Sequence, residues 1–151
     1  MAQRSQQTGQ GAVSPALDEM VCDLIGYMLD ELAAGEDPGV AACAEDAASG
    51  RVAAVFSDDG EEACLDAARE FVVRYARGSK EDGMGPVDRY AIACAGCVEV
   101  DGGYRDAVLV SFYERALSCG YSAYVLYENP GDEEAFAWSE PAPAGEEPPL
   151  L

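Results

Sequence analysis

Two cysteines three positions apart, Cys94 and Cys97, form the one short motif in this sequence that is typical of redox or metal chemistry. In a thioredoxin-like site such a pair opens a helix, whose N-terminus lowers a thiol pKa. Here residues 98–100 continue a strand pattern, in which residues three apart point to opposite faces. A bulge at Gly96 would bring the sulfurs together, and zinc would need two further ligands. We interpret the pair as structural thiols, with a redox pair and a metal site as alternatives.

Four acidic residues around a predicted hairpin are the next candidates: Glu99, Asp101, Asp106 and Glu114. Carboxylates on paired strands can hold Mg²⁺ in nuclease-like sites. Such sites also need a lysine beside the second acid, and none of the four is followed by one. Because the chain has 29 acidic residues, several on one hairpin are expected by chance. We therefore interpret them as a solvated strand face and expect no metal ion or other cofactor.

Aromatic residues gather near the C-terminal end of the chain and could form an interaction surface. The candidates are Tyr121, Tyr124, Tyr127 and Trp138. On a strand Tyr121 and Tyr124 point to opposite faces, so at least one of them should leave the core. Exposed, these side chains would anchor a partner protein. The alternative is that they pack beneath the helices.

The sequence has no histidine and a net charge of −20. Without histidine there is no Ser-His-Asp or Cys-His nucleophile pair and no HExxH zinc motif. The nine basic residues, of which Lys80 is the one lysine, form no cluster. Binding to nucleic-acid phosphates or to an anionic membrane surface requires such a cluster. We expect neither direct nucleic-acid binding nor membrane association.

The first residues, 1–14, are polar and contain no apolar segment of the kind found in a signal peptide. No apolar run approaches the roughly 18 residues that a membrane span needs. These observations favour the cytoplasm, where thiols stay reduced. Most of the six cysteines should then be small, buried apolar residues.

Apolar residues at helical spacing predict a first helix over 15–34. Ser14 is a good N-cap, Pro15 suits the first helical position, and Gly35 suits the end. A second helix is predicted between Asp59 and Gly78, where Asp59 and Glu62 have the spacing of a capping box.

The remaining segments favour strands. Residues 38–57 form either an Ala-rich helix followed by a strand or, as we favour, a hairpin of 40–44 and 51–57. A β meander follows, over 87–100, 104–115, 121–128 and 135–138, with a turn at Asp101-Gly102-Gly103. We assign two sets of alternating residues to one core face: Tyr90, Ile92, Cys94, Val98 and Val100, and Val108, Val110 and Phe112.

Together these elements predict an α+β fold in which two helices pack on one face of a mostly antiparallel sheet, in the order α-β-β-α-β-β-β-β. We expect a disordered leader over 1–13, a single domain over 14–138, and an acidic, Pro-rich tail over 139–151 that leans toward polyproline conformation.

The leading functional hypothesis is a non-catalytic interaction module that offers an acidic surface to a protein partner, which includes a second copy of itself in a small homo-oligomer. Electrostatic steering would bring the partner in and aromatic anchors would supply the affinity. One alternative is a small enzyme that uses Cys94 and Cys97, or the hairpin carboxylates with a divalent cation. The other is a nucleic-acid mimic that occupies the basic groove of a DNA-binding protein.

The net charge generates a first prediction. Since −20 on so small a chain repels itself, moderate salt should raise the melting temperature by screening that repulsion. Thermal denaturation followed by circular dichroism at increasing salt measures this effect. An unchanged or falling midpoint would show that self-repulsion does not limit stability.

Overall fold

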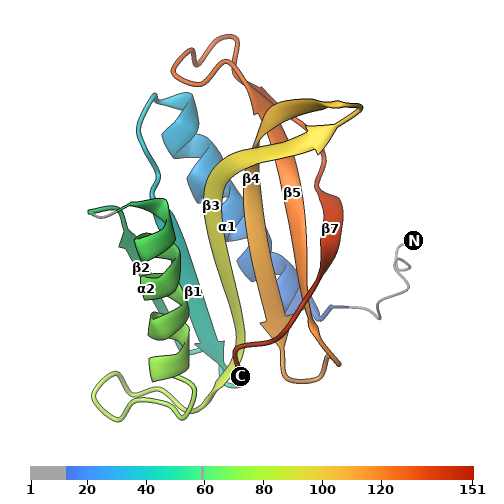
Figure 1. The fold of residues 1–151 in the computed structure, drawn as a ribbon. Helices are drawn as coiled ribbons and strands as arrows, with labels where there is room; N and C mark the ends of the chain where they lie inside the picture. The colour runs from blue at the N-terminus through green and yellow to red at the C-terminus, as the bar shows by residue number, and fades with distance from the viewer. Residues whose placement is uncertain (1–12, 59) are drawn as a thin grey trace.

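The described part of the chain folds into two helices and a seven-stranded antiparallel sheet (Figure 1), which confirms the predicted α+β class. The computed structural model describes residues 13–58 and 60–151. Its elements are α1 (Pro15–Ala33), β1 (Val40–Asp46), β2 (Arg51–Phe56), α2 (Glu61–Arg74), β3 (Val87–Val100), β4 (Gly103–Glu114), β5 (Gly120–Glu128), β6 (Ala137–Trp138) and β7 (Ala142–Glu147). The strands lie in the order β2-β1-β3-β4-β5-β6, and β7 also pairs with β5.

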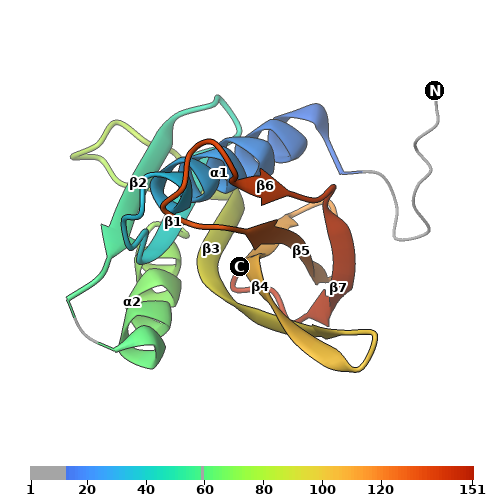
Figure 2. The same ribbon diagram turned by 90° about the horizontal axis from the view of Figure 1, so that it is seen from above.

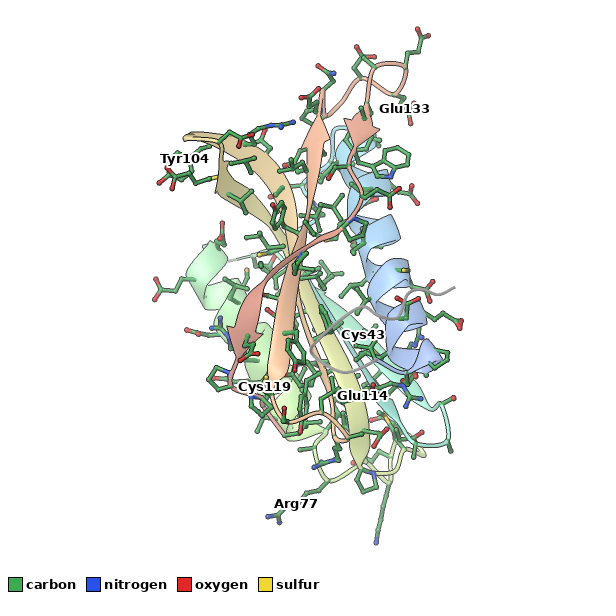
Figure 3. All side chains as sticks on the ribbon, turned by 90° about the vertical axis from the view of Figure 1, so that its right-hand side faces the viewer. Cys43, Arg77, Tyr104, Glu114, Cys119 and Glu133 are labelled. Carbon is green, nitrogen blue, oxygen red and sulfur yellow. The ribbon has the colours of Figure 1, made fainter. Side chains whose placement is uncertain are left out.

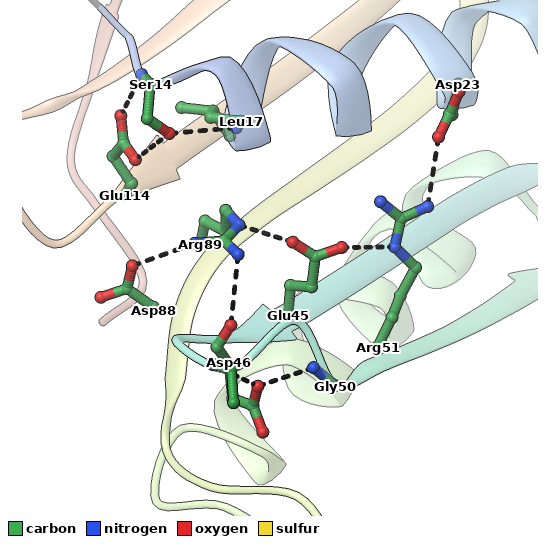
Figure 4. A network of polar contacts seen from close by, with 11 residues as sticks. Ser14, Leu17, Asp23, Glu45, Asp46, Gly50, Arg51, Asp88, Arg89 and Glu114 are labelled. Atoms are coloured by element: carbon green, nitrogen blue, oxygen red, sulfur yellow. Dashed lines mark hydrogen bonds and ion pairs between the residues drawn. The ribbon is translucent and has the colours of Figure 1, made fainter.

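α1 begins at the predicted residue because Ser14 caps it. The Ser14 Oγ accepts a hydrogen bond from the Leu17 N–H at 3.1 Å, and Pro15 follows at the first helical position. Ser14 also donates from its N–H and its Oγ to the Glu114 carboxylate, at 2.8 and 2.7 Å (Figure 4). The buried face of α1 is a stripe of seven apolar residues, Leu17, Met20, Leu24, Ile25, Met28, Leu29 and Leu32.

The two helices cover opposite faces of the sheet, not one face as expected (Figures 1 and 2). Side chains alternate along a strand, so β1 and much of β3 are buried on both faces. The strand residues that pack with α1 include Ala41, Cys43, Ala91, Ala93, Val108, Val110 and Val125. Those that pack with α2 include Val40, Ala42, Ala44, Tyr90, Ile92, Cys94 and Tyr113.

The predicted core face combined residues from these two layers. Val108 pairs with Ala95 and Val110 with Ala93, so both valines lie on the α1 face. Tyr90, Ile92 and Cys94 lie on the α2 face. Small alanines between larger residues give only a weak alternating pattern, which is why the second buried face was missed.

The β1–β2 hairpin confirms the favoured reading of residues 38–57. One carboxylate organises its turn: Asp46 Oδ1 accepts from the N–H groups of Ala48 and Gly50 at 2.9 and 2.7 Å. Asp46 Oδ2 accepts from the Gly85 N–H at 2.9 Å. These bonds, of which that from Gly85 contributes most to the shift, hold the pKa of Asp46 below its usual value, because they stabilise the ionised form. Asp46 thereby ties the turn to the loop that precedes β3.

α2 differs from the prediction at both ends. Its N-cap is Gly60, and no described side chain caps it. Asp59, on which the expected capping box depends, lies outside the described residues. The helix ends at Arg74, and a turn leads to Gly78, which has φ +92°. A Cβ at Gly78 would lie 2.7 Å from the Met84 carbonyl oxygen, so the close approach of the loop requires glycine. In the described parts of the chain, neither helix combines the length and apolar character needed to cross a bilayer.

Three strands of the meander form within one residue of the predicted bounds, and the fourth, predicted over 135–138, is limited to Ala137–Trp138. Part of the expected tail also belongs to the sheet. β7 pairs with β5 from Gly120 opposite Glu147 to Tyr124 opposite Ala142, with an irregularity between Ser122 and Ala123. The composition of this segment does not predict a strand, because backbone hydrogen bonds to a neighbouring strand do not depend on apolar side chains. Of the expected leader, residues 1–12 lie outside the described part of the chain.

A buried ion-pair network joins β1, β2 and β3 at one end (Figure 4). Glu45 lies between two arginines: its Oε1 is 2.6 Å from Arg89 Nε and its Oε2 is 2.7 Å from Arg51 Nε. Arg51 also reaches Asp23 on α1 at 3.3 Å. The side chains of Glu45 and Arg89 are each 7% exposed. Charges so deeply buried are tolerated only when each has a partner.

Removing one of these partners should be costly. We expect Arg89→Leu to lower the free energy of unfolding by about 3 kcal/mol, because Glu45 keeps a buried charge with one partner fewer. Urea denaturation measures this loss, and the double variant Glu45→Gln/Arg89→Leu should recover part of it. The exposed pair of Arg105 and Glu128 is the control, since Arg105→Leu should cost under about 1 kcal/mol. Equal losses for the two single arginine variants would contradict a special role for the buried network.

Candidate functional site

The structure does not bring Cys94 and Cys97 together. Both lie on β3, where Cys94 is buried under α2 and Cys97 is exposed. β3 pairs with β4 without a register shift from Arg89 to Val100, so Gly96 forms no bulge. A Cβ at Gly96 would lie 3.0 Å from Leu109 Cδ1, which indicates that glycine makes room for a neighbouring side chain. The two thiols therefore point to opposite faces.

Burial makes the thiols of the core poor nucleophiles. Burial raises the pKa of Cys94 to about 11, with a smaller contribution from the Glu61 carboxylate. Cys43, on the α1 face, also has its pKa raised by burial to about 11 (Figure 3). Of the other cysteines Cys64 is buried, Cys119 is half-buried and Cys22 is exposed. Half of the six, not most of them, are thus buried.

The four hairpin carboxylates are divided between two ends of the sheet. Glu99, Asp101 and Asp106 are exposed near the hairpin tip, where Tyr104 projects (Figure 3). Glu114 lies eight residues beyond Asp106 on β4, about 26 Å away along the strand at roughly 3.3 Å per residue. Among the described residues, no group of three or more acidic or thiol side chains is placed to hold a metal ion.

Glu114 has a structural partner instead. It is buried, and its two oxygens accept the N–H and the hydroxyl of Ser14, which caps α1. This contact joins residues 100 positions apart, so spacing in the sequence gives no signal for it.

The aromatic candidates divide between core and surface. Tyr121 and Tyr127 are buried, Tyr124 is half-buried, and Trp138 is 62% exposed. Phe136 lies between Tyr127 and Trp138, with ring centroids 6.1 and 5.8 Å away. Trp138 is therefore the member of the predicted surface that a partner could reach.

A groove that was not anticipated lies between α1 and the edge of the sheet. It has a volume of about 350 Å³. We call it the β2 groove; its lining is Met20, Asp23, Leu24 and Tyr27 of α1, Ala41, Ala42 and Cys43 of β1, and Arg51, Ala53, Ala54 and Val55 of β2. Tyr27 and Val55 are 37% and 48% exposed, so both offer apolar surface at the groove.

The charges at the β2 groove are paired within the chain. Arg51 is held by Glu45 and Asp23, and these contacts raise the pKa of its guanidinium although partial burial opposes them. Burial and the nearby Glu31 raise the pKa of Tyr27, so its hydroxyl stays neutral at physiological pH. The groove is therefore mainly apolar, and the two charges in its lining, Asp23 and Arg51, are paired with each other.

Comparisons with family models, with curated proteins and with solved structures find no match to this chain.

The placement of the cysteines predicts unequal reactivity. A rise in the Cys94 pKa from 9.0 to about 11 leaves roughly a hundredfold less thiolate near neutral pH. In the folded protein iodoacetamide should therefore label Cys97 rapidly and Cys94 at least about a hundredfold more slowly, as measured by peptide mass spectrometry. Labelling of Cys94 should rise with pH up to its pKa.

Unfolding in urea is the control, since it should make the two rates similar. Comparable labelling in the folded state, or a disulfide between Cys94 and Cys97 after mild oxidation, would revive the redox interpretation.

Proposed function

We propose that this protein is a non-catalytic interaction module that binds an extended, cationic segment of a partner protein alongside β2. The observation that carries the proposal is the outer edge of β2, which has no partner strand within residues 13–58 and 60–151 and borders the β2 groove. A strand edge with free N–H and C=O groups can take up one further strand.

The two edges of the sheet differ in composition. β2 reads Arg-Val-Ala-Ala-Val-Phe and contains neither proline nor an acidic residue. β7, which covers β5 at the other side, contains Pro143, Gly145, Glu146 and Glu147. Proline and charge are the usual means by which proteins block an edge strand. β2 has no proline or acidic residue, and its one charge, Arg51, is already paired with Glu45 and Asp23, which favours this edge as the docking site.

The hairpin geometry indicates which backbone groups are available. The Asp46 N–H donates to the Gly50 carbonyl at 2.8 Å, so in an antiparallel ladder the next pair, Glu45 and Arg51, is not hydrogen-bonded. The alternation continues along β2, and the N–H and C=O groups of Arg51, Ala53 and Val55 point away from β1. An added strand would bond to these residues.

The β2 groove offers room for the side chains of such a strand. Its floor contains Ala41, Cys43 and Ala53, which are small, and its α1 wall offers Tyr27. Alternate side chains of an extended segment would enter the groove, while the others would face the α2 side of the sheet. Tyr27 and Val55 would be the apolar anchors.

Net charge favours a cationic partner over a second copy of the chain. A surface with a net charge of −20 attracts basic segments and speeds their association. Two copies would repel each other for the same reason. Basic residues of the bound segment would be attracted by the excess of acidic residues over the whole surface.

A peptide of alternating lysine and valine tests the proposal. We expect it to bind the wild-type protein in a fluorescence anisotropy titration, and a peptide of alternating glutamate and valine not to bind. Ala53→Pro removes an outward N–H while the β1–β2 ladder stays intact, and should weaken binding by about tenfold or more, the value of one or two hydrogen bonds.

Two controls separate strand addition from simple charge attraction. A lysine-valine peptide with alternate backbone nitrogens methylated keeps its charge but cannot extend the sheet. Its affinity for the wild-type protein should be no higher than that of the unmethylated peptide for Ala53→Pro. Docking at β2 would be refuted if the methylated and unmethylated lysine-valine peptides bound the wild-type protein equally well. It would also be refuted if the wild-type protein and Ala53→Pro bound the unmethylated peptide equally well. A dimer in sedimentation equilibrium that Ala53→Pro abolishes would instead identify a second copy as the occupant.

A further inference from the structure

A second cavity lies on the opposite, α2 face of the sheet, where the chain after β5 folds back over the strands. Its volume is about 590 Å³. We call it the tail cavity; its lining includes Leu65 and Arg69 of α2, Tyr90, Ile92 and Cys94 of β3, Leu109 and Ser111 of β4, Ser122 of β5, and Ala144, Glu147, Pro148, Pro149 and Leu150 of the C-terminal segment. Figure 2 shows the sheet curling so that the chain end lies within its curve.

The cavity exists because small side chains stand where a packed core would need large ones. α2 covers β1 and β3, and its 14 residues do not extend across the sheet. Ile92, Ser111 and Ser122 form a row across β3, β4 and β5, so two of the three positions carry only a hydroxymethyl group. Packed interiors contain few voids larger than a water molecule. A space of about 590 Å³ lies instead within the range of small-molecule sites.

The cover of the cavity is attached to its wall by a few polar contacts. The Leu150 N–H donates to the Tyr90 hydroxyl at 3.1 Å. The Ser111 hydroxyl donates to Glu147 Oε2, also at 3.1 Å. Beyond β7 the segment is otherwise held by Leu150 and Leu151, which are half-buried against the α2 core. Residues 148–151 are thus held by few contacts, whereas Ala144 and Glu147 belong to β7 and are fixed by its pairing with β5.

The charges at the cavity disfavour an ionic ligand. Arg69 at the rim is already paired with Asp66 at 3.2 Å. The Glu147 carboxylate would repel an anion, and so would the net charge of −20. A cation that entered among Leu65, Ile92 and Leu109 would lose most of its hydration for a single counter-charge, the half-buried Glu147 carboxylate, so its desolvation would be only partly offset. The hydroxyls of Tyr90 and Ser111 remain as hydrogen-bonding groups for a polar but uncharged substituent.

From these observations we infer that the tail cavity binds a neutral, apolar small molecule that carries a hydroxyl or similar uncharged polar group. Its apolar body would contact Leu65, Ile92 and Leu109, and its polar group would meet the serine row. The site lies on the other face of the sheet from the β2 groove, so the inference stands independently of the proposed function.

Nile red, a neutral dye whose fluorescence rises in apolar surroundings, is the probe for the full chain. We expect a saturable increase that corresponds to one dye molecule per chain. Dodecanol should displace the dye at a concentration about tenfold lower than dodecanoate does, because the carboxylate of dodecanoate would face Glu147. No saturable increase would overturn the inference, and equally effective dodecanoate would overturn the neutral class of ligand.

Two variants fill the cavity from opposite walls. Ser122→Phe enters from β5 and Leu65→Trp from α2, and each should weaken Nile red binding by about tenfold or more, as overfilling of a packed space does. Far-UV circular dichroism and the urea midpoint show whether the variants are folded, and Arg105→Leu, at an exposed residue outside both sites, serves as the control that should leave dye binding unchanged. If both filled variants bind the dye as the wild type does, the dye is elsewhere and the inference fails.

Discussion

Burial of β1 on both faces is the constraint on which the rest of the structure depends. Most positions of the strand carry small side chains, three alanines and one cysteine, so α1 and α2 can approach it from opposite sides. The same burial encloses Glu45 at the end of the strand, which is why that carboxylate requires Arg89 and Arg51. Since β1 needs a neighbour on each side, β2 becomes the outermost strand of the sheet.

Both proposed sites result from small residues beside a helix that does not cover the whole sheet. On the α1 face Ala53 and Cys43 leave the β2 groove, and on the α2 face Ser111 and Ser122 leave the tail cavity. The acidic residues are largely outside these two spaces. In the proposed function, charge would select what approaches the protein, and the apolar spaces would hold what binds.

The elements were largely predictable from the sequence, whereas the sites were not. Helical and strand periodicity identified α1, the β1–β2 hairpin and the meander, because large apolar residues repeat there at regular spacing. β7 was missed since Pro143 and Gly145 argue against a strand, and its stability comes from pairing with β5. The prediction that both helices pack on one face of the sheet was wrong, because Ala91 and Ala93 are small and indicate a second buried face only weakly. Which strand forms the edge of the sheet depends on the strand order, and the local sequence pattern does not predict that order.

The bond between Ser14 and Glu114 has a consequence for the order of folding. The first turn of α1 is completed by a residue that the ribosome adds 100 positions later. Until β4 has been synthesised, the nascent helix therefore lacks both this anchor and most of the strands that bury its apolar stripe. The N-terminal helix is made early but docks late, and closing so long a loop slows the formation of the native core.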